Sequence, residues 1–484
     1  MQQKSLFKNT IYKAILSFIN ILAPVLIGSY IVKLLDIELY GAYNKVYSEF
    51  QVFLVFASFG IYTFGVREIS KIRNNKEKVS ILFSNLFLLS LITNLIVTII
   101  YILYSILTSS GITTTLYLIM IIQYIANIIY VEFVNEALEN YKFITLKSVI
   151  IKIIYMISLF VFVKNPNDII LYAIIVGLSI FFNNLVSFIY AKKRIGFNFK
   201  KIEIKKYIPS LFTILIITNI NLLYTQLDKV MLGRIVGNVS VTMYYIPYYL
   251  MGTLASIPYA IINVSIPRLS YLLENEGKQA YIKKLNESIS SLLFLIIPMC
   301  FGVLVLANEA ILLYAGSKYM AMVPTLIIAC ISRIFISIES VMTNLVLYPN
   351  NKEKVLLKFL LLCGISNLIM NFLLVYFKVF TPSTALITTT IAEILLIIIE
   401  LYYSRKELDL YFTFFTKQNI LYLVLGISFI LIAYLIRLLN LNFWLNMFTI
   451  IVTCIVVYGI VLYIKKDSNL IFIKDKLLKK IIKK

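Results

Sequence analysis

Apolar runs of about 20 residues recur along the whole chain, and they constrain the fold more than any other feature. A run of this length is what an α-helix needs to cross a bilayer core, and a helix pairs all of its backbone polar groups internally. Outer-membrane barrels instead alternate apolar and polar residues. Composition agrees, because 61% of the residues are hydrophobic and only 14% are charged. The sequence therefore predicts an all-α, polytopic integral membrane protein.

We expect about 14 transmembrane helices. Their predicted ranges are 10–32, 46–66, 80–107, 113–135, 146–163, 168–191, 208–232, 241–266, 286–306, 321–347, 356–377, 384–403, 418–437 and 444–464. An even number of spans places both termini on the same side of the membrane.

The distribution of positive charge predicts which side that is. Of the 45 Lys and Arg residues, 36 fall on the side of the termini and 8 on the opposite side, with Arg333 inside a span. Cytoplasmic loops carry such an excess, so we expect a multi-pass protein of the plasma membrane with both termini in the cytoplasm. This bias accounts for most of the net charge of +22, and we expect the bilayer, not nucleic acid, as the partner of the basic segments.

Several kinds of chemistry are disfavoured by the residues present. The chain has no histidine, which removes His-ligated metals and His general bases. Its only Gly-Lys pair, Gly277-Lys278, lacks the upstream glycine of a nucleotide-binding loop. All predicted loops are too short to form a soluble catalytic domain. We therefore expect a protein that is not an enzyme and that holds no cofactor.

An internal repeat divides the chain into two similar halves. An offset of 201 residues aligns cations with cations and tyrosines with tyrosines: Lys33 with Arg234, Tyr43 with Tyr244, Tyr47 with Tyr248, and Arg67 with Arg268. Parallel repeats with a site between the halves are a transporter design. We predict an N-terminal lobe at 1–200 (helices 1–6), a C-terminal lobe at 201–405 (helices 7–12), and helices 13–14 with a basic tail at 406–484.

Two regions of the chain resemble signatures of a known family. LYGAYNKVYSEFQVFLVFASFGIYTFGVREIS is similar to the helix 1–2 signature of Wzx-like polysaccharide flippases, and QLDKVMLGRIVG, the Tyr244-Tyr245 pair and IINVSIPRLS are similar to the helix 7–8 signature. These flippases belong to the multidrug/oligosaccharidyl-lipid/polysaccharide exporter superfamily.

The resemblance implies a V-shaped, two-lobe bundle that works by alternating access. Its substrate would be an oligosaccharide, of capsule or teichoic-acid type, linked through pyrophosphate to undecaprenol. We expect a monomer, with the polymerase or ligase of the same pathway as a partner.

A pyrophosphate inside a membrane bundle requires cations. Six residues are predicted to supply them: Arg67 and Arg268 at the cytoplasmic ends of two spans, Lys33 and Arg234 at the outer ends, and Lys152 and Arg333 deeper in apolar sequence. Arg67 and Arg268 are equally compatible with ordinary positive-inside residues, and Arg333 with a salt bridge to a residue such as Glu393.

Sugars require aromatic faces and hydrogen-bonding groups. Four tyrosines near the outer starts of two spans are predicted to contact them: Tyr43, Tyr47, Tyr244 and Tyr248. The alternative is an interfacial aromatic belt.

A coupling-cation site is predicted from polar residues on three helices. The related lipid II flippase class is similar here, with an acid on helix 7 and polar residues on helices 11 and 12. The corresponding residues are Asp228, Asn367, Asn371 and Thr388, although Asn371 stands where a second acid is expected. Oxygen ligands suit a hard cation, but such residues also join helices to one another. Na⁺ and H⁺ both stay open as the coupling ion, with Asp228, Glu339 or Glu393 as proton carriers, and so does the membrane potential alone.

Two other functions compete with the flippase. A membrane glycosyltransferase or polymerase could use the acids of Asp36-x-Glu38 in the first outer loop, but long outer loops are absent from the sequence. A cation-coupled drug exporter of the same superfamily would share the fold, and the helix 7–8 signature favours the carrier of lipid-linked sugars.

Overall fold

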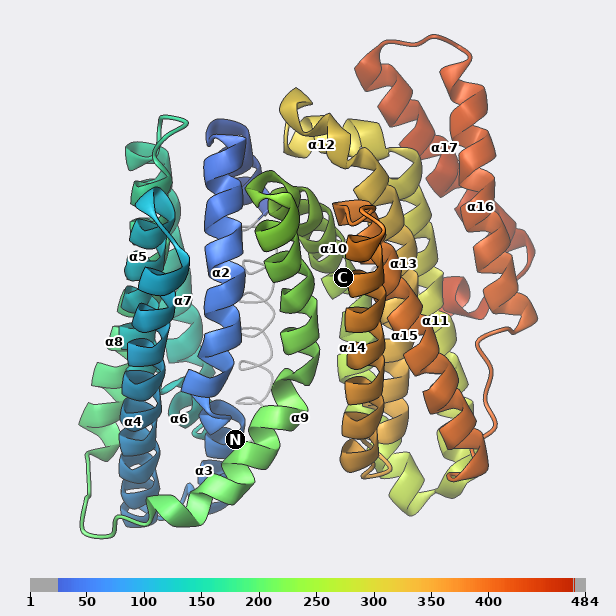
Figure 1. The fold of residues 1–484 in the computed structure, drawn as a ribbon. Helices are drawn as coiled ribbons and strands as arrows, with labels where there is room; N and C mark the ends of the chain where they lie inside the picture. The colour runs from blue at the N-terminus through green and yellow to red at the C-terminus, as the bar shows by residue number, and fades with distance from the viewer. Residues whose placement is uncertain (1–24, 473, 475–484) are drawn as a thin grey trace, which may run out of the picture. The chain divides into compact units, whose positions relative to one another are not determined.

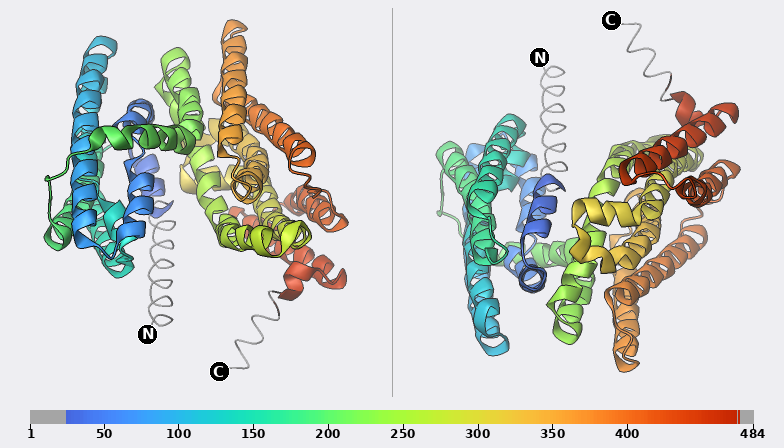
Figure 2. Two further views of the ribbon diagram at one scale, coloured as in Figure 1. Left: turned by 90° about the horizontal axis from the view of Figure 1, so that it is seen from below. Right: turned by 90° about the horizontal axis from the view of Figure 1, so that it is seen from above.

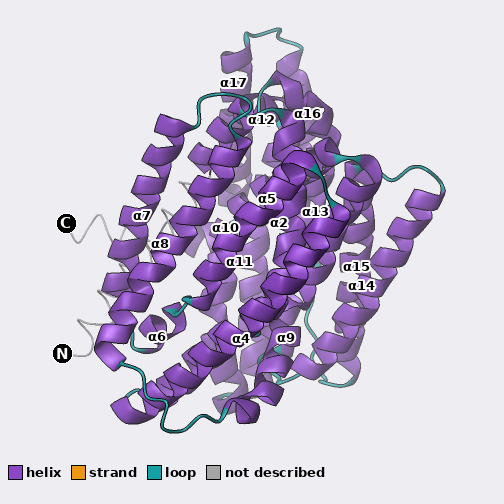
Figure 3. Ribbon diagram, turned by 60° about the vertical axis from the view of Figure 1, so that its left-hand side comes forward, coloured by secondary structure: helices purple, strands orange, loops and turns teal. Residues whose placement is uncertain are grey.

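The computed structural model describes residues 25–472 and 474, and for residues 217–225 it describes the helix but not the side chains. Among the described residues every regular element is a helix (Figure 3). The prediction of an all-α membrane protein is confirmed. The chain divides into two compact units, Met1–Thr242 and Met243–Lys484.

The first unit is built from long helices joined by short loops (Figure 1). Its elements are a helix at Val25–Leu34, α2 (Ile37–Ser58), α3 (Ile61–Ile72), α4 (Lys76–Thr108), α5 (Gly111–Ile128), α6 (Glu132–Ala137), α7 (Tyr141–Phe162), α8 (Ile169–Ile195), α9 (Ile204–Met231) and the π-helical turn η1 (Leu232–Val236). Helix α2 contacts α4, α5 and α9, and α5 packs along α8. The described helices of this unit therefore gather around α2 and α5.

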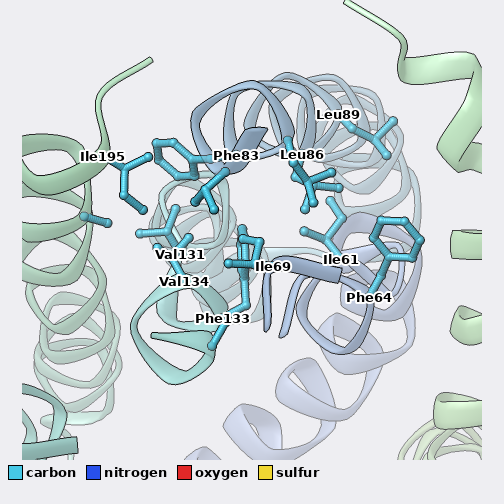
Figure 4. Close-up of a cluster of buried hydrophobic side chains, with 14 of the residues drawn as sticks. Ile61, Phe64, Ile69, Phe83, Leu86, Leu89, Val131, Phe133, Val134 and Ile195 are labelled. Carbon is cyan, nitrogen blue, oxygen red and sulfur yellow. The ribbon is translucent and has the colours of Figure 1, made fainter. Parts of the chain in front are cut away.

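A cluster of buried hydrophobic side chains joins α3, α4, α6 and α8 (Figure 4). Ile61 and Phe64 of α3 pack against Phe83 of α4, Phe133 of α6 and Ile195 of α8. Burial of these side chains away from both lipid and water fixes the short helices α3 and α6 against the long ones.

Helices α2 and α3 form one membrane span that is broken in the middle. Phe59 and Gly60 both adopt left-handed backbone conformations, with φ of 48° and 71°. A Cβ at Gly60 would lie 2.8 Å from the carbonyl oxygen of Leu211 on α9. Glycine is favoured at this break because it permits both the positive φ and the close approach.

The second unit is also built from long helices joined by short loops. Its elements are α10 (Asn238–Asn275), which starts in the first unit, α11 (Gly277–Val305), α12 (Ala307–Tyr314), the 3₁₀ turn η2 (Ser317–Met322), α13 (Val323–Val341), the π-helical turn η3 (Met342–Leu347), α14 (Glu353–Tyr376), α15 (Pro382–Lys406), α16 (Lys417–Arg437) and α17 (Phe443–Ile464). Helix α13 packs between α11 and α15, and α14 packs on α15. Helix α16 lies against α11 and α17 (Figure 2).

The membrane spans agree closely with the apolar pattern. Twelve helical segments of the described residues are long and apolar enough to cross a membrane. Of the other two predicted spans, 208–232 coincides with α9, and 10–32 falls partly outside the described residues, with Val25–Leu34 as its described part. The chain is a multi-pass membrane protein with about the predicted number of spans.

Helix boundaries repeat at the offset found in the sequence. Helices α2 and α10 begin at Ile37 and Asn238, and α4 and α11 begin at Lys76 and Gly277. Both intervals equal the offset of 201 residues. The lobe boundaries at 200 and 405 stay predictions, and the compact units divide at Thr242 because α9 packs on α2, α3 and α4.

Candidate functional site

Arg333 is a buried cation inside a membrane-spanning helix. It lies on α13 with 6% of its surface exposed, and its guanidinium carbon is 5.1 Å from the ring centre of Tyr248. Its Nη2 donates to the Tyr248 carbonyl oxygen at 3.3 Å, whereas its Nε has no hydrogen-bond partner. No carboxyl oxygen of the described residues lies within 4.0 Å of Arg333, so the salt bridge to Glu393 considered from the sequence is not formed.

The surroundings of Arg333 combine an aromatic face with hydroxyl groups. Gly252 lies beside the guanidinium, and a Cβ there would be 3.4 Å from Nη2. One turn along α13, the Ser337 hydroxyl lies 3.3 Å from the Tyr259 hydroxyl. A cation beside aromatic rings and hydroxyl groups can bind a phosphorylated sugar.

The four predicted sugar-contacting tyrosines form two stacked pairs at the repeat offset. Tyr43 and Tyr47 have ring centres 6.1 Å apart, and Tyr244 and Tyr248 have ring centres 6.0 Å apart. Tyr43 and Tyr244 are buried in their own units, whereas Tyr47 and Tyr248 are partly exposed. The second member of each pair is therefore the better placed to meet a ligand.

Arg234 forms an ion pair with a buried acid that the sequence analysis did not single out. Its Nε and Nη2 donate to the two carboxyl oxygens of Glu49 at 2.9 Å each. Tyr104 and Tyr117 donate to the same carboxylate. If Arg234 binds pyrophosphate, the pyrophosphate must compete with the Glu49 carboxylate for the guanidinium.

The cations Arg67, Arg268 and Lys33, which the sequence predicts at the two membrane faces, are exposed. The side chains of Arg67 and Arg268 lie beside Glu68 and Glu276, at 2.8 and 4.0 Å, and Lys33 is exposed. Because Arg67 and Arg268 lie in different units, their pairing stays a prediction.

Lys152 lines a pocket between α7 and α8. The pocket has a volume of about 420 Å³, and Ser148, Tyr155, Ser179 and Asn183 also line it. A lysine that lies among hydroxyl and amide groups within a membrane-spanning helix is compatible with the predicted phosphate contact.

The polar residues of the predicted cation site are brought together on α14 and α15. The Thr388 hydroxyl donates to Asn371 Oδ1 at 2.6 Å, and Asn371 Nδ2 donates to Asn367 Oδ1 at 3.3 Å. Asn367 Nδ2 lies 3.3 Å from the Thr389 hydroxyl. Asp228 is fully buried on α9 in the other unit. These mutual hydrogen bonds are those of residues that join two helices.

Asp36 and Glu38, the acids that a glycosyltransferase would use, have structural partners in this protein. Asp36 is the N-cap of α2 and accepts from the backbone N–H groups of Glu38 and Leu39 at 2.9 and 3.0 Å. Glu38 accepts from the Asn238 side chain at 2.9 Å. Both carboxylates are thus used to begin α2 and to hold it to α10.

A cluster of buried acids on α13 and α15 joins Glu339, named from the sequence as a possible proton carrier, to Glu400 and Thr343, which sequence reasoning missed. The Thr343 hydroxyl donates to Glu339 at 2.6 Å and lies 3.4 Å from Glu400. Glu400 and Glu49 share one signal, an acid within an apolar run, which could have found them.

Comparison with known proteins gives one family. Residues 6–273, more than half of the chain, match the family described as "Polysaccharide biosynthesis protein". A protein of Escherichia coli (strain K12) named as an O-antigen transporter is 25% identical over 420 residues, covering 83% of this chain and 97% of that protein. One of Shigella dysenteriae with the same name is 23% identical over 379 residues, covering 76% and 93%.

A solved structure shares the fold. "Lipid II flippase MurJ, inward closed conformation" superposes with a TM-score of 0.72 at 17% identity, covering 94% of this chain and 99% of that one. These relatives are named as transporters and a flippase, in agreement with the prediction that the chain is not an enzyme. The chain belongs to the polysaccharide biosynthesis protein family, and its predicted place in the multidrug/oligosaccharidyl-lipid/polysaccharide exporter superfamily is confirmed.

Proposed function

We propose that this protein is a flippase that moves an undecaprenyl-pyrophosphate-linked oligosaccharide, of capsule or teichoic-acid type, from the cytoplasmic to the outer leaflet. Transport would proceed by alternating access, with both termini in the cytoplasm. The names of the relatives and the membrane fold support transport of a lipid-linked glycan.

The main structural support for this proposal is Arg333, a buried guanidinium that no described carboxylate pairs with. A guanidinium buried in a membrane span is costly without an anion, and among the described residues no carboxylate is paired with it. A pyrophosphate would supply the missing charge and an acceptor for the unpartnered Nε. The adjoining Tyr248 ring would then face the first sugar.

The lipid part of the substrate would lie on an apolar surface of the second unit. A cavity of about 690 Å³ between α11, α12 and α17 is lined by apolar side chains such as Pro298, Ile451 and Ile455. A polyprenyl chain requires only such an apolar groove. The second unit thus offers a cation for the pyrophosphate and an apolar cavity for the hydrocarbon chain.

Coupling would use a cation gradient or the membrane potential. The sodium hypothesis rests on Asp228 together with Asn367, Asn371 and Thr388, of which the last three lie together on α14 and α15. The proton hypothesis rests on the buried acids. Sodium or proton dependence of transport by the purified protein separates the two.

The test is depletion of the protein in cells that make the glycan, followed by reconstitution. We expect undecaprenyl-linked glycan to accumulate at the cytoplasmic face on depletion, and the purified protein to move it across liposome membranes. Normal glycan distribution after depletion would overturn the proposal. Accumulation of unextended lipid-linked sugar instead would support the glycosyltransferase, and drug efflux without lipid flipping would support the exporter.

A further inference from the structure

The acids Glu339 and Glu400 lie together inside the second unit, and neither contacts Arg333. Glu339 lies on α13 and Glu400 on α15, and these two helices pack along each other. Glu400 has 0% of its surface exposed and Glu339 has 7%. Each lies within an apolar span, where an ionised carboxylate is strongly disfavoured.

Thr343 connects the two carboxyl groups. It lies one turn after Glu339, in the π-helical turn η3, and its hydroxyl is 2.6 Å from Glu339 Oε1 and 3.4 Å from Glu400 Oε1. A hydroxyl has a single hydrogen to donate. If that hydrogen is used on Glu339, the contact with Glu400 is satisfied only when Glu400 carries a proton and donates to Thr343 Oγ1.

The second oxygen of Glu400 is an independent sign of a missing ligand. Its Oε2 is buried and has no hydrogen-bond partner. No Lys or Arg nitrogen of the described residues lies within 4.0 Å of Glu339 or Glu400. With no cation to balance two negative charges, a proton is the ligand that removes the cost of burial.

The groups that face these acids do not change this conclusion. Among the described residues, the titratable side chains close enough to interact electrostatically with one or more of the acids come from α10, the end of η3, α14 and α15: Tyr259, Tyr348, Cys363 and Glu393. Three of the four are neutral in their ordinary form, and the fourth is another acid. Among the described residues no group of three His, Cys, Asp or Glu side chains is arranged to hold a metal ion.

We propose that Glu339 and Glu400 hold one exchangeable proton between them, with the Thr343 hydroxyl as the bridge. Release of the proton would leave two buried carboxylates side by side, which the packed α13–α15 contact cannot retain without opening toward water. Proton binding would therefore favour the closed contact and proton release the open one.

The proton site gives the proposed transport a driving ion, and that second step rests on the proposed function. Glu339 lies six residues after Arg333 on α13, about 9 Å along the helix. Opening of the α13–α15 contact would therefore move the helix that carries the pyrophosphate-binding guanidinium. Glu400 lies six residues before the end of α15 at Lys406, about 9 Å from the predicted cytoplasmic end.

The first test needs no substrate. Infrared difference spectra of the purified full chain in lipid nanodiscs, recorded on raising the pH, report the neutral carboxyl group directly. We expect a neutral-carboxyl band that disappears on alkalisation, that is lost in the double variant Glu339→Gln/Glu400→Gln, and that changes in frequency and in the pH at which it disappears in each single variant. Glu309→Gln is the matched control, because Glu309 forms an ion pair with Arg437 at 2.8 Å and should contribute no such band.

Three results would overturn the site. They are a band that the double variant keeps unchanged, the absence of a titrating neutral carboxyl in the wild type, and removal of the band by Na⁺ at constant pH, which would make the ligand a metal cation. Thr343→Val guards against a misfolded Gln variant, because it keeps the shape of the side chain and removes only the hydroxyl. We expect this variant to retain the band at a shifted frequency.

The second test concerns coupling. In proteoliposomes that contain the lipid-linked glycan, we expect an imposed proton gradient to accelerate flipping by the wild type and by Glu287→Gln, which removes an exposed acid, and not by Glu400→Gln. Equal acceleration in Glu400→Gln would remove the coupling role. Failure of the wild type to flip the glycan at all would overturn the proposed function, and the infrared result would still decide whether the proton site exists.

Discussion

The guanidinium of Arg234 holds both carboxyl oxygens of Glu49, with Nε and Nη2 each at 2.9 Å. The two residues are 185 positions apart in the chain, and the contact joins the turn η1, which follows α9, to the middle of α2. Glu49 is almost wholly buried, with 2% of its side chain exposed, and Arg234 is 31% exposed. This ion pair therefore fixes η1 to α2 within the first unit, at a place where the sequence predicts a substrate cation.

Arg234→Gln should destabilise the protein, because it leaves the Glu49 carboxylate buried with only tyrosine donors. We expect a loss of about 3 kcal/mol, the lower end for breaking a buried pair, since Arg234 is partly exposed. Thermal unfolding of the purified protein measures it. Lys33→Gln, at the equivalent position of the repeat, is the control and should have little effect because Lys33 is exposed. The double variant Glu49→Gln/Arg234→Gln should be more stable than Arg234→Gln, and the opposite order would contradict this account.

Arg333→Gln should weaken substrate binding without loss of stability. Hydrogen bonds to charged groups contribute about 1.5–3 kcal/mol, so we expect about 10- to 100-fold weaker binding of a short-chain prenyl pyrophosphate, measured by calorimetry. Arg333→Lys keeps the charge but loses the planar fork and should be intermediate. Because the buried guanidinium has no carboxylate partner among the described residues, Arg333→Gln should unfold at the same or a higher temperature.

Arg437→Gln provides the matched control for Arg333. Arg437 is paired with Glu309 at 2.8 Å, so its loss should lower stability and leave pyrophosphate affinity unchanged. If both variants lower affinity equally, Arg333 has no special role. If Arg333→Gln lowers the unfolding temperature as much as Arg437→Gln does, its role is structural.

Position 252 should accept only a small side chain beside the Arg333 guanidinium if the substrate is to bind there. A Cβ at this position would lie 3.4 Å from Arg333 Nη2 and 3.9 Å from Cζ, an ordinary contact. Gly252→Ala should therefore bind the prenyl pyrophosphate with near-normal affinity. Gly252→Val adds methyl groups directed at the guanidinium and should weaken binding about as much as Arg333→Lys does. Equal affinities of the Ala and Val variants would show that the substrate does not approach this side of Arg333.

The apolar pattern predicts membrane spans closely because it reports burial in lipid. Predicted spans 418–437 and 444–464 correspond to Lys417–Arg437 and Phe443–Ile464. The pattern is less informative where a helix leaves the membrane: α11 begins at Gly277, not at 286, because its first turns are polar. It also gives no sign of the break at Phe59–Gly60, which depends on the approach of α9.

Contacts within one helix or between neighbouring helices were accessible from the sequence, and distant ones were not. Asn367 and Asn371 are one turn apart, so their shared face could be predicted, and α15 follows α14 directly. Glu49 and Arg234 could not be paired, because periodicity says which face of a helix is buried but not which helix covers it. The same limit hid Glu400, whose partner Thr343 lies 57 residues earlier.

The Asn–Thr cluster on α14 and α15 should behave as a structural contact. Asn371→Ala removes the acceptor of the 2.6 Å bond from Thr388 and should cost about 1–3 kcal/mol. The unfolding temperature should be the same in sodium and in potassium chloride. A bound sodium ion at a hundredfold its dissociation constant would add about 2.7 kcal/mol. Such a sodium effect, present in the wild type and lost in Asn371→Ala but not in Ser366→Ala, a partly exposed position on the same helix, would restore the predicted cation site.

Gly41→Ala should disrupt the junction between α2 and the first turn of α10. A Cβ at Gly41 would lie 2.2 Å from the carbonyl oxygen of Asn238 and 2.5 Å from its carbonyl carbon. These are backbone atoms, which can retreat only if the start of α10 moves, and that start is also held by the bond from Asn238 to Glu38. We expect a loss of about 1–3 kcal/mol in unfolding free energy, together with lower abundance in the membrane. Gly459→Ala on α17 faces open space and should be neutral or gain up to about 1 kcal/mol from helix propensity. Equal stability of the two variants would mean that the α2–α10 contact is looser than its backbone distances indicate.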